Sequence, residues 1–518
     1  MGEQVGEQHE AAGVVTESDD VGARIAARLS QRRSANLTVA SARVLPAGAS
    51  RASYLVALSG DTDEQIIVRA VPSARSDDGG LAVEADILTA AASAGVPVPA
   101  VLDAGLDPAT SVLIVPLEQA DDNIRFFDHR REDARTDWER GGLPNAEWEA
   151  LLGEARRRAD AAGHFRYPFP AEYGGRDGSN LAMAVIREHL ASRGLGLHCD
   201  LQNEHAIVGN NIGLLLMLEY GTPEQQQEWV EGLAAGTKFF AFGITEPDHG
   251  SDATYMETTA VRDGDEWVIN GEKTWNTGIH VAHRNIIFAR TDGEPGNARG
   301  ITAFLVDPQA DGFTVEEYLW TFNMPTDHAH VTLRDVRVPH SAIFGAEGAG
   351  LQVVQHFFNE NRIRQAASSL GAAQYCVDRA VAYANERAPF GKKLSTNQAI
   401  QFPLVDLHTR CAMIRSLIRE TAWKMDTYGP FAASAEVSMC NYQANRLCCD
   451  AADTAMQVFG GRGYSRHEPF EHIYRHHRRY RITEGADEIQ MRRVAGYLFG
   501  FMGGAAPKGV NTPGATGS

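Results

Sequence analysis

The chain has 518 residues, 43% of them hydrophobic and 22% charged, a composition that fits a soluble protein of several domains rather than one core. A net charge of −19 argues against nucleic acid as a general partner, and no apolar run reaches the ~20 residues of a membrane helix. The N-terminal sequence resembles neither a secretory signal nor a transit peptide, and the six cysteines lack metal-binding spacing, so we expect a cytoplasmic protein with no membrane or nucleic-acid partner.

In chain order, the segments differ in composition and in the period of their apolar residues, and together they predict a multidomain α+β protein. Residues 1–34 are acidic and polar, and residues 503–518 are rich in glycine and proline, so both are predicted to be disordered or flexible tails. Residues 35–118 contain short β-like runs, ASYLVAL and QIIVRA, before an alanine-rich helix. A helical domain, a central β domain and a second helical domain are then predicted over residues 119–235, 236–345 and 346–502.

The central domain is predicted from apolar residues that alternate with polar ones. The run TTAVRDGDEWVINGEKTWN has this period of two, and NIIFAR, GITAFLV and HVTLRDVRVP continue it. Asn270–Gly271 lies between two strand-like runs and is a dipeptide that two-residue turns favour. We therefore predict a hairpin turn at this dipeptide.

The C-terminal domain returns to helical spacing. Apolar residues three or four positions apart predict one buried helix face, formed by Leu370, Ala373, Val377, Ala380 and Ala384. Farther along, His472 and His476 lie one helical turn apart and His477 follows, but no third metal ligand is evident beside them. We therefore predict solvated histidines and no metal site.

Two motifs in the central domain suit a ligand. The loop TEPDHGSD follows the strand-like run AFGI, and its hydroxyl groups and glycine suit hydrogen bonding to a ligand, although a plain turn has a similar composition. Trp275 and Thr277 place an indole close to a hydroxyl, which suits stacking on a flat heterocycle and hydrogen bonding to its edge. A single tryptophan is more often part of a core, so that alternative stays open.

Two further motifs lie at helix ends in the C-terminal domain. Arg387, in ERAPFGK, suits a phosphate clamp, or alternatively an exposed helix end where its charge favours the helix dipole. In QVFGGRG, the three glycines permit the close backbone approach that a pyrophosphate needs. Because this motif does not follow a strand, it does not predict a Rossmann fold.

Five motifs, in this order, closely resemble those of the acyl-CoA dehydrogenase family of flavoproteins: TEPxxGSD, NGxKxWxT, ERxxFGK with a later glutamine, QxFGGxG and EGxxxIQ. The resemblance covers roughly residues 122 to 500. It implies FAD as cofactor, an acyl-CoA substrate, and the fold of that family: an N-terminal helical domain, a central β domain and a C-terminal four-helix bundle.

The resemblance also implies roles for particular residues. Thr245 and Ser251 would belong to the loop that meets the flavin and the thioester, and Trp275 and Thr277 would meet the isoalloxazine ring. The residues that would hold the ADP half of a neighbouring subunit's FAD are Arg387, Phe390, Gln398, Gln457 and Gly461. The residues that would contact the substrate are Ser251, Arg362 and Gly485.

Glu484, in RITEGADEIQ, matches the position of the family's catalytic base. Removal of an α-proton needs a carboxylate in a dry pocket, where desolvation raises its pKa toward the working pH. The resemblance implies that the backbone N–H of Glu484 and a ribityl hydroxyl stabilise the enolate-like charge. Some family members carry the base at the position before Arg362, which here is Asn361 and lacks a carboxylate. A structural glutamate that caps a turn is the alternative for Glu484.

Residues 35–118 resemble the N-terminal lobe of aminoglycoside-phosphotransferase-like kinases. Arg69 would take the phosphate-contacting strand position, and Glu84 would be its helix partner. The chain then passes directly into dehydrogenase-like sequence, without the HGDxxxxN motif of a catalytic lobe. We therefore expect a docking or stabilising lobe without kinase activity.

The sequence thus predicts FAD-dependent α,β-desaturation of an acyl-CoA thioester in fatty acid metabolism, by a homodimer or homotetramer that passes electrons to an electron-transferring flavoprotein. A flavin oxidase or monooxygenase on the same fold is an alternative, but such monooxygenases need no carboxylate base, so Glu484 disfavours them. A catalytically idle flavoprotein whose N-terminal lobe binds a partner is a further alternative.

Overall fold

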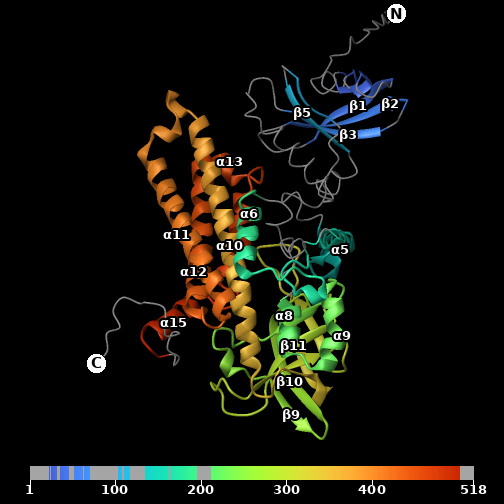
Figure 1. Ribbon diagram of the computed structural model, residues 1–518, viewed down its shortest axis with the longest axis vertical. Coiled ribbons are helices and arrows are strands. Elements are labelled where there is room, and N and C mark those ends of the chain that lie inside the picture. Colours follow the sequence, from blue (N-terminus) through green and yellow to red (C-terminus); the bar gives the residue numbers. More distant parts are fainter. Residues whose placement is uncertain are drawn as a thin grey trace, which may run out of the picture. The chain divides into compact units, whose positions relative to one another are not determined.

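The computed structural model describes residues 23, 25–27, 29–31, 36–45, 52–61, 64–70, 103–107, 110–116, 135–194 except 162 and 164, and 212–501. The chain divides into two compact units, residues 1–125 and 126–518 (Figure 1). The predicted partner Glu84 and the predicted tail 503–518 lie outside the described residues.

The first unit contains a five-stranded antiparallel sheet in the order β1-β2-β3-β5-β4. Its strands are β1 (Leu37–Leu45), β2 (Ala52–Gly60), β3 (Glu64–Ala70), β4 (Asp103–Asp107) and β5 (Thr110–Pro116). Arg69 lies on β3 between Ser53 of β2 and Leu113 of β5, and its side chain lies outside the described part. The resemblance to a kinase lobe stays a prediction.

Part of the predicted N-terminal disordered segment is folded. The described residues within 23–31 are helical, and Ile25 and Leu29 are buried. The backbone N–H of Leu37 donates to Ser30 Oγ at 3.0 Å, which ties this helical segment to the first strand. The prediction of disorder is therefore wrong here, because Ile25 and Leu29, four positions apart, form an apolar helix face that packs into a core.

In the described part of the second unit, a small two-stranded sheet of β6 (Thr136–Asp137) and β7 (Leu143–Pro144) precedes four helices. They are α5 (Ala146–Ala161), α6 (Asn180–Ala191), α8 (Ile212–Tyr220) and α9 (Pro223–Ala234). Thr222 and Gln225 form a capping box that starts α9, with a proline at its first turn. Met217 of α8 and Trp229 of α9 belong to the same buried core as the central sheet, so these helices cover one of its faces (Figure 1).

The central domain is an eight-stranded sheet in the order β13-β14-β10-β9-β11-β12-β15, with β8 paired to β11 beside this path. Its strands are β8 (Phe240–Gly243), β9 (Thr259–Asp263), β10 (Glu266–Thr277), β11 (Arg284–Arg290), β12 (Ile301–Val306), β13 (Phe313–Tyr318), β14 (His328–Pro339) and β15 (Ile343–Phe344). The β domain predicted from the alternating pattern is confirmed.

The predicted hairpin turn at Asn270–Gly271 is wrong. The chain turns between β9 and β10 at Gly264, which has φ 64°. Asn270 lies within β10, where the pairing with β14 is irregular, and its Oδ1 accepts a hydrogen bond from the backbone N–H of Asp335 at 2.8 Å. The sequence offers two turn-forming dipeptides, Asp-Gly and Asn-Gly, and the cross-strand pairing decides that the second forms a bulge.

The C-terminal domain is built on three long helices, α10 (Gly350–Glu386), α11 (Gln398–Tyr428) and α12 (Ser434–Phe459). Helix α6 packs against α10 and α11 and shares their core (Figure 1). The chain continues through α13 (Gly461–Tyr464), α14 (Phe470–Arg478), the 3-10 turn η8 (Arg479–Arg481) and α15 (Asp487–Leu498). The predicted buried face on α10 is confirmed, with exposures of 2% or less at Leu370, Ala373, Val377, Ala380 and Ala384. Within the described residues, no helix combines the length and apolarity that crossing a membrane requires.

The prediction of solvated histidines is wrong. His472, His476 and His477 lie on α14, and each is 1% exposed. His477 Nδ1 lies 2.9 Å from Ser369 Oγ of α10. Arginines occupy the more exposed positions of α14, so the imidazoles take the inner face against α10 and α12. Among the described residues, no cluster suited to a metal ion is found.

Candidate functional site

The loop between η8 and α15 holds Glu484 in an unfavourable backbone conformation. Glu484 has φ 57°, a left-handed value that costs a residue with a side chain about 1 kcal/mol. Arg362 Nε donates to the carbonyl oxygen of Glu484 at 3.0 Å, and Gln490 Nε2 donates to that of Gly485 at 2.9 Å. Gly485 has φ 94°, and a Cβ there would lie 2.8 Å from Arg362 Nη2. The glycine therefore lets the loop approach this arginine.

The Glu484 carboxylate has two unlike oxygens. Oε1 accepts hydrogen bonds from Asn361 Nδ2 and, at 3.0 Å, from Gln365 Nε2, both on α10. The residue as a whole is half-buried, but Oε2 is buried and has no hydrogen-bond partner among the described residues. Burial raises the pKa of Glu484 to about 7, against the opposing effects of Arg362 and the two amides. Such a carboxylate can take up a proton at neutral pH.

Arg362 is the cation that most strongly lowers the pKa of this carboxyl group. It is 3% exposed, and its guanidinium lies over the ring of Phe358, 5.1 Å from the centroid. Burial and the positive charge of Arg493 lower the pKa of Arg362 to about 10, so it stays protonated at neutral pH. Its hydrogen bonds to the Glu484 carbonyl make it an anchor of the loop, while its predicted substrate contact stays a prediction.

On the β domain, a buried ion pair fastens the loop that contains Thr245 and Ser251. Glu246 and Lys273 are 2.7 Å apart and 4% and 0% exposed. Lys273 belongs to β10, and the carbonyl oxygen of Thr245 accepts from a backbone N–H of the same strand. Ser251 lies at the exposed turn of the loop. The pair therefore joins the two sequence motifs of this domain into one rigid surface.

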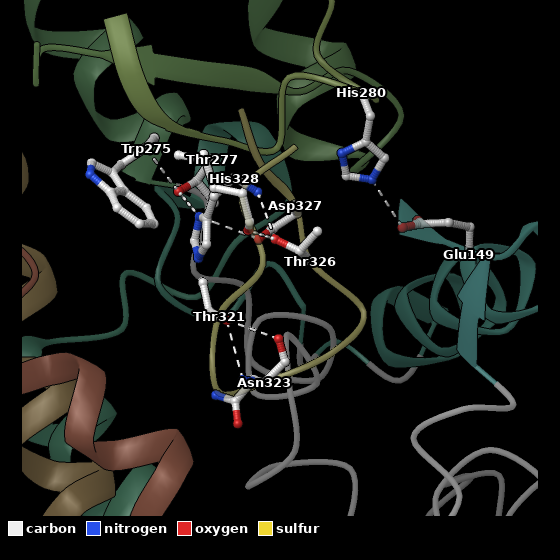
Figure 2. A network of polar contacts seen from close by, with 10 residues as sticks. Glu149, Trp275, Thr277, His280, Thr321, Asn323, Thr326, Asp327 and His328 are labelled. Carbon is white, nitrogen blue, oxygen red and sulfur yellow. Dashed lines mark hydrogen bonds and ion pairs between the residues drawn. The ribbon is translucent and has the colours of Figure 1, made fainter. Parts of the chain in front are cut away.

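Trp275 is half-exposed, at 51%, so the alternative that it belongs to a core is wrong. It has φ 56°, and its indole meets the ring of His328 edge-on with centroids 6.2 Å apart (Figure 2). Thr277 Oγ1 lies 2.9 Å from His328 Nδ1. A flat apolar face thus stands beside a hydroxyl and an imidazole, which fits an aromatic heterocycle with a polar edge.

A second group of predicted residues lies at the far end of the helical domain. Tyr383 of α10 and Phe459 of α12 stack with ring centroids 4.1 Å apart, which brings the ends of these helices together. Five exposed residues surround this end: Arg387, Phe390, Gln398, Gln457 and Gly461. Arg387 directly follows the last residue of α10 and is 25 positions after Arg362 (387 − 362), so about 37 Å of helix separates the two. These residues are therefore remote from Glu484 of the same chain.

A groove of about 690 Å³ opens beside the first turns of α10. Its lining includes Arg299, Gln352 and Phe431 together with acidic side chains. Gln355, also in the lining, accepts a hydrogen bond from Arg493 of α15 and precedes Arg362 by two helical turns. The groove is open to solvent and lies along the first turns of α10, the helix that also contacts Glu484.

Sequence reasoning missed two side chains at this site. Gln365 was assigned no role, and Asn361 was noted only for the carboxylate it lacks, yet both bond Glu484. Their spacing of four places both amides on one face of α10, a signal that is visible in the sequence once a helix is assumed.

Comparison with known proteins identifies the family. Models of the acyl-CoA dehydrogenase N-terminal, middle and C-terminal domains match residues 121–237, 241–336 and 348–499. The mitochondrial short-chain specific acyl-CoA dehydrogenase of Bos taurus is 36% identical over 332 residues, which are 64% of this chain and 78% of that protein. The chain belongs to the acyl-CoA dehydrogenase family. It is therefore an FAD-dependent oxidoreductase that acts on CH–CH groups.

Two other similarities bear on the function of this chain. The caffeyl-CoA reductase-Etf complex subunit CarC of Acetobacterium woodii is 32% identical over 339 residues, covering 65% of this chain and 87% of that one. The structure of butyryl-CoA dehydrogenase from Megasphaera elsdenii has a TM-score of 0.63 and 28% identity, covering 73% of this chain and 95% of its own. The predicted order of helical, β and helical domains is thereby confirmed.

Proposed function

We propose that this acyl-CoA dehydrogenase desaturates an acyl-CoA thioester between its α and β carbons, with Glu484 as the base that takes the α-proton. The observation that carries the proposal is the Glu484 carboxylate, whose Oε2 is buried without a partner in the described structure and whose pKa is about 7. A glutamate that only capped a turn would accept hydrogen bonds from its own loop, whereas the carboxylate of Glu484 accepts them from two side chains of α10.

The chemistry follows from these groups. A thioester carbonyl acidifies the neighbouring α-C–H, so a base of modest strength suffices if it is held within reach of the proton. Arg362 and Gly485 fix the loop, which holds the carboxylate in place before the substrate binds. The backbone N–H of Glu484 is the proposed donor to the thioester oxygen, where negative charge develops.

FAD supplies the acceptor for the β-hydrogen, taken as a hydride, when it is bound. Trp275 and Thr277 fit its ring system, because the indole is half-exposed and stands beside a polar group at its edge. Thr245 and Ser251 lie on the loop that Lys273 fastens to the same strand. The groove beside α10 is the proposed path of the CoA chain toward Glu484.

The reverse reaction, reduction of an unsaturated thioester, is a second candidate. The Acetobacterium woodii relative is named a reductase and part of a complex with Etf, which supports this direction and an electron-transferring flavoprotein as partner. A carboxyl group with a pKa of about 7 can donate as well as accept a proton at neutral pH. The supply of oxidant or reductant then decides the direction in the cell.

Glu484→Gln tests the proposal. The variant is expected to keep FAD and bind acyl-CoA but to lose at least about 1000-fold in kcat, because the base is gone while the shape persists. A panel of acyl-CoA thioesters with an artificial electron acceptor measures the rate, and the flavin spectrum measures FAD content. Glu488→Gln, a nearby exposed carboxylate on α15, is the matched control and should stay active. Substantial activity of Glu484→Gln would contradict the proposed role of Glu484 as the base.

A further inference from the structure

Glu484 lies at the end of a chain of buried polar side chains that runs between α10 and α12. Gln365 Oε1 accepts a hydrogen bond from Asn441 Nδ2 at 3.2 Å, and Asn441 Oδ1 accepts one from Asn445 Nδ2 at 3.0 Å. Ser369 Oγ donates to Asn445 Oδ1 at 2.6 Å. All four side chains are 5% exposed or less. A buried polar chain of this kind keeps its members in fixed orientations.

Backbone carbonyls fix the direction of this chain, because a carbonyl oxygen only accepts hydrogen bonds. Asn441 Nδ2 donates to the carbonyl oxygen of Arg362 at 2.9 Å, so the amide nitrogen of Asn441 faces α10. The same nitrogen faces Gln365, which must therefore present its oxygen to Asn441. The Gln365 amide nitrogen is then turned toward Glu484 and cannot exchange places with the oxygen.

The two oxygens of Glu484 consequently differ in what they can bind. Oε1 faces the N–H donors of Gln365 and Asn361, so a proton on Oε1 would point at other protons. Oε2 is buried and meets no donor among the described residues. An incoming proton is therefore directed to Oε2.

We propose that Asn361 and Gln365 are positioning residues that hold Glu484 by Oε1, so that Oε2 alone takes the α-proton. The inference rests on the proposed function and adds to it the accepting atom and the side chains that select it. Asn361 occupies the position at which some family members carry the base, and here its amide instead donates a hydrogen bond to the base. Asn441 acts one step farther away, by fixing the orientation of Gln365.

The charges around Glu484 make this arrangement measurable by titration. Arg362 of α10 and Arg479 of η8 act on the carboxylate, and Arg493 of α15 lies near Arg362, whereas α12 contributes neutral amides to the chain. Burial raises the pKa of Glu484, and the amides of Asn361 and Gln365 lower it. Loss of either donor must therefore raise this pKa further, while a purely structural role in packing would leave it in place.

The kinetic test compares the pH profiles of kcat/KM for the wild-type FAD-loaded enzyme, Asn361→Leu and Gln365→Met, which remove the donors but keep similar volumes. The acid limb of this profile, where the rate falls as Glu484 becomes protonated, should move to higher pH by about one unit in each variant. This shift is the effect of losing one hydrogen bond to a charged group. Above the limb, kcat should fall about tenfold with KM little changed. Asn359→Leu is the matched control, since this buried amide on α10 bonds Pro430 and Ser434 instead. Its acid limb should stay in place.

An infrared difference titration gives a second readout that needs no turnover. The infrared band of the Glu484 carboxyl group is identified as the one that Glu484→Gln removes, and it is followed against pH in the FAD-loaded protein without substrate. In Asn361→Leu and Gln365→Met, the pH midpoint of this titration should move upward, as the acid limb of the kinetic profile does. If either variant loses FAD, Gln365→Glu keeps the side-chain shape and should raise the midpoint further, because two carboxyl groups then share the site. An unchanged midpoint in the variants that keep FAD overturns the inference.

Absence of desaturation by the wild type would instead refute the proposed function, and the infrared titration would still decide the role of the amides.

Discussion

Glu484 combines a left-handed backbone conformation with a buried carboxylate, and both lower the stability of the folded protein. Its folded-state pKa of about 7 lies above the ordinary value of 4.5. A pKa that is raised in the folded state makes the folded protein more stable when Glu484 is protonated. This contribution to the free energy of unfolding is fully present below pH 4.5 and is lost as the pH rises through 7. In the proposed mechanism desaturation requires the ionised form, so activity should rise over the pH range in which stability falls.

This opposition predicts the stability of Glu484→Gln. A neutral amide carries no desolvated charge, so the variant should be more stable than the wild type at pH 8, by up to about 3 kcal/mol, and nearly equal to it at pH 4.5. Calorimetric Tm values at the two pH values check this. A lower Tm for the variant at pH 8 would show that the ionised carboxylate stabilises the fold.

At the scale of elements, strand β10 and the loop after β8 act as one piece because the Glu246–Lys273 pair joins them. Burial lowers the pKa of Lys273 to about 8, against the opposing charge of Glu246. Glu246 also accepts backbone hydrogen bonds from Glu257 and Thr258, so its carboxylate is enclosed on several sides. The pair thereby sets the position of the proposed flavin-facing residues.

Lys273→Met should therefore destabilise the fold by about 3 kcal/mol, since it leaves the Glu246 charge buried without its cation. The double variant Glu246→Gln/Lys273→Met removes both charges and should recover much of the loss. Urea unfolding of the wild type and both variants measures the difference. Equal stability of Lys273→Met and the wild type would show that the backbone donors alone satisfy Glu246.

At the scale of the whole molecule, the proposed cofactor residues lie in two groups, one on the β domain and one at the far end of the helical domain. Trp275 and Thr277 lie on the β domain, whereas Arg387 lies about 37 Å along α10 from Arg362. Phe390 is fully exposed at this far end. The arrangement supports a homodimer or homotetramer in which the far end of one chain completes the site of its neighbour.

Mixing two inactive variants tests this assembly. Arg387→Glu should lose FAD, and Glu484→Gln should lack the base, but a mixed dimer contains one site with an intact Glu484 and a neighbour's intact Arg387. In the purified hetero-dimer one of the two sites is complete, so activity should return to about half of the sites. Co-expressed, differently tagged chains purified as hetero-oligomers provide the sample. Inactive hetero-oligomers, or a flavin-loaded active monomer in sedimentation, would contradict the arrangement.

The N-terminal unit is expected to lack kinase activity, because phosphoryl transfer needs a metal-binding aspartate and a base that a second lobe supplies. Incubation of the full chain with ATP and a 4-hydroxyacyl-CoA should give no phosphorylated product. Removal of residues 1–118 should leave the flavin spectrum and the rate of desaturation unchanged, since the family domain models begin at residue 121. ATP-dependent phosphorylation, or loss of FAD from a folded truncated chain, would contradict this view.

Features that depend on local pattern could be predicted from the sequence alone. The alternation of the β domain and the apolar spacing from Leu370 to Ala384 predict which residues turn inward, because strands and helices repeat every two and every 3.6 residues. The five ordered motifs predicted the family for the same reason, since each is a short local stretch.

Features that depend on partners far apart in the chain could not be predicted in this way and are visible only in the folded protein. Asn270–Gly271 has the composition of a turn, but its pairing with β14 makes it a bulge. His476 is polar, yet packing of α14 against the bundle buries it. The hydrogen bond of Gln365 to Glu484 joins residues 119 positions apart, and its direction is fixed by Asn441 on a third segment. Hydrogen-bond partners of this kind are selected by distance and orientation in space, which no local period encodes.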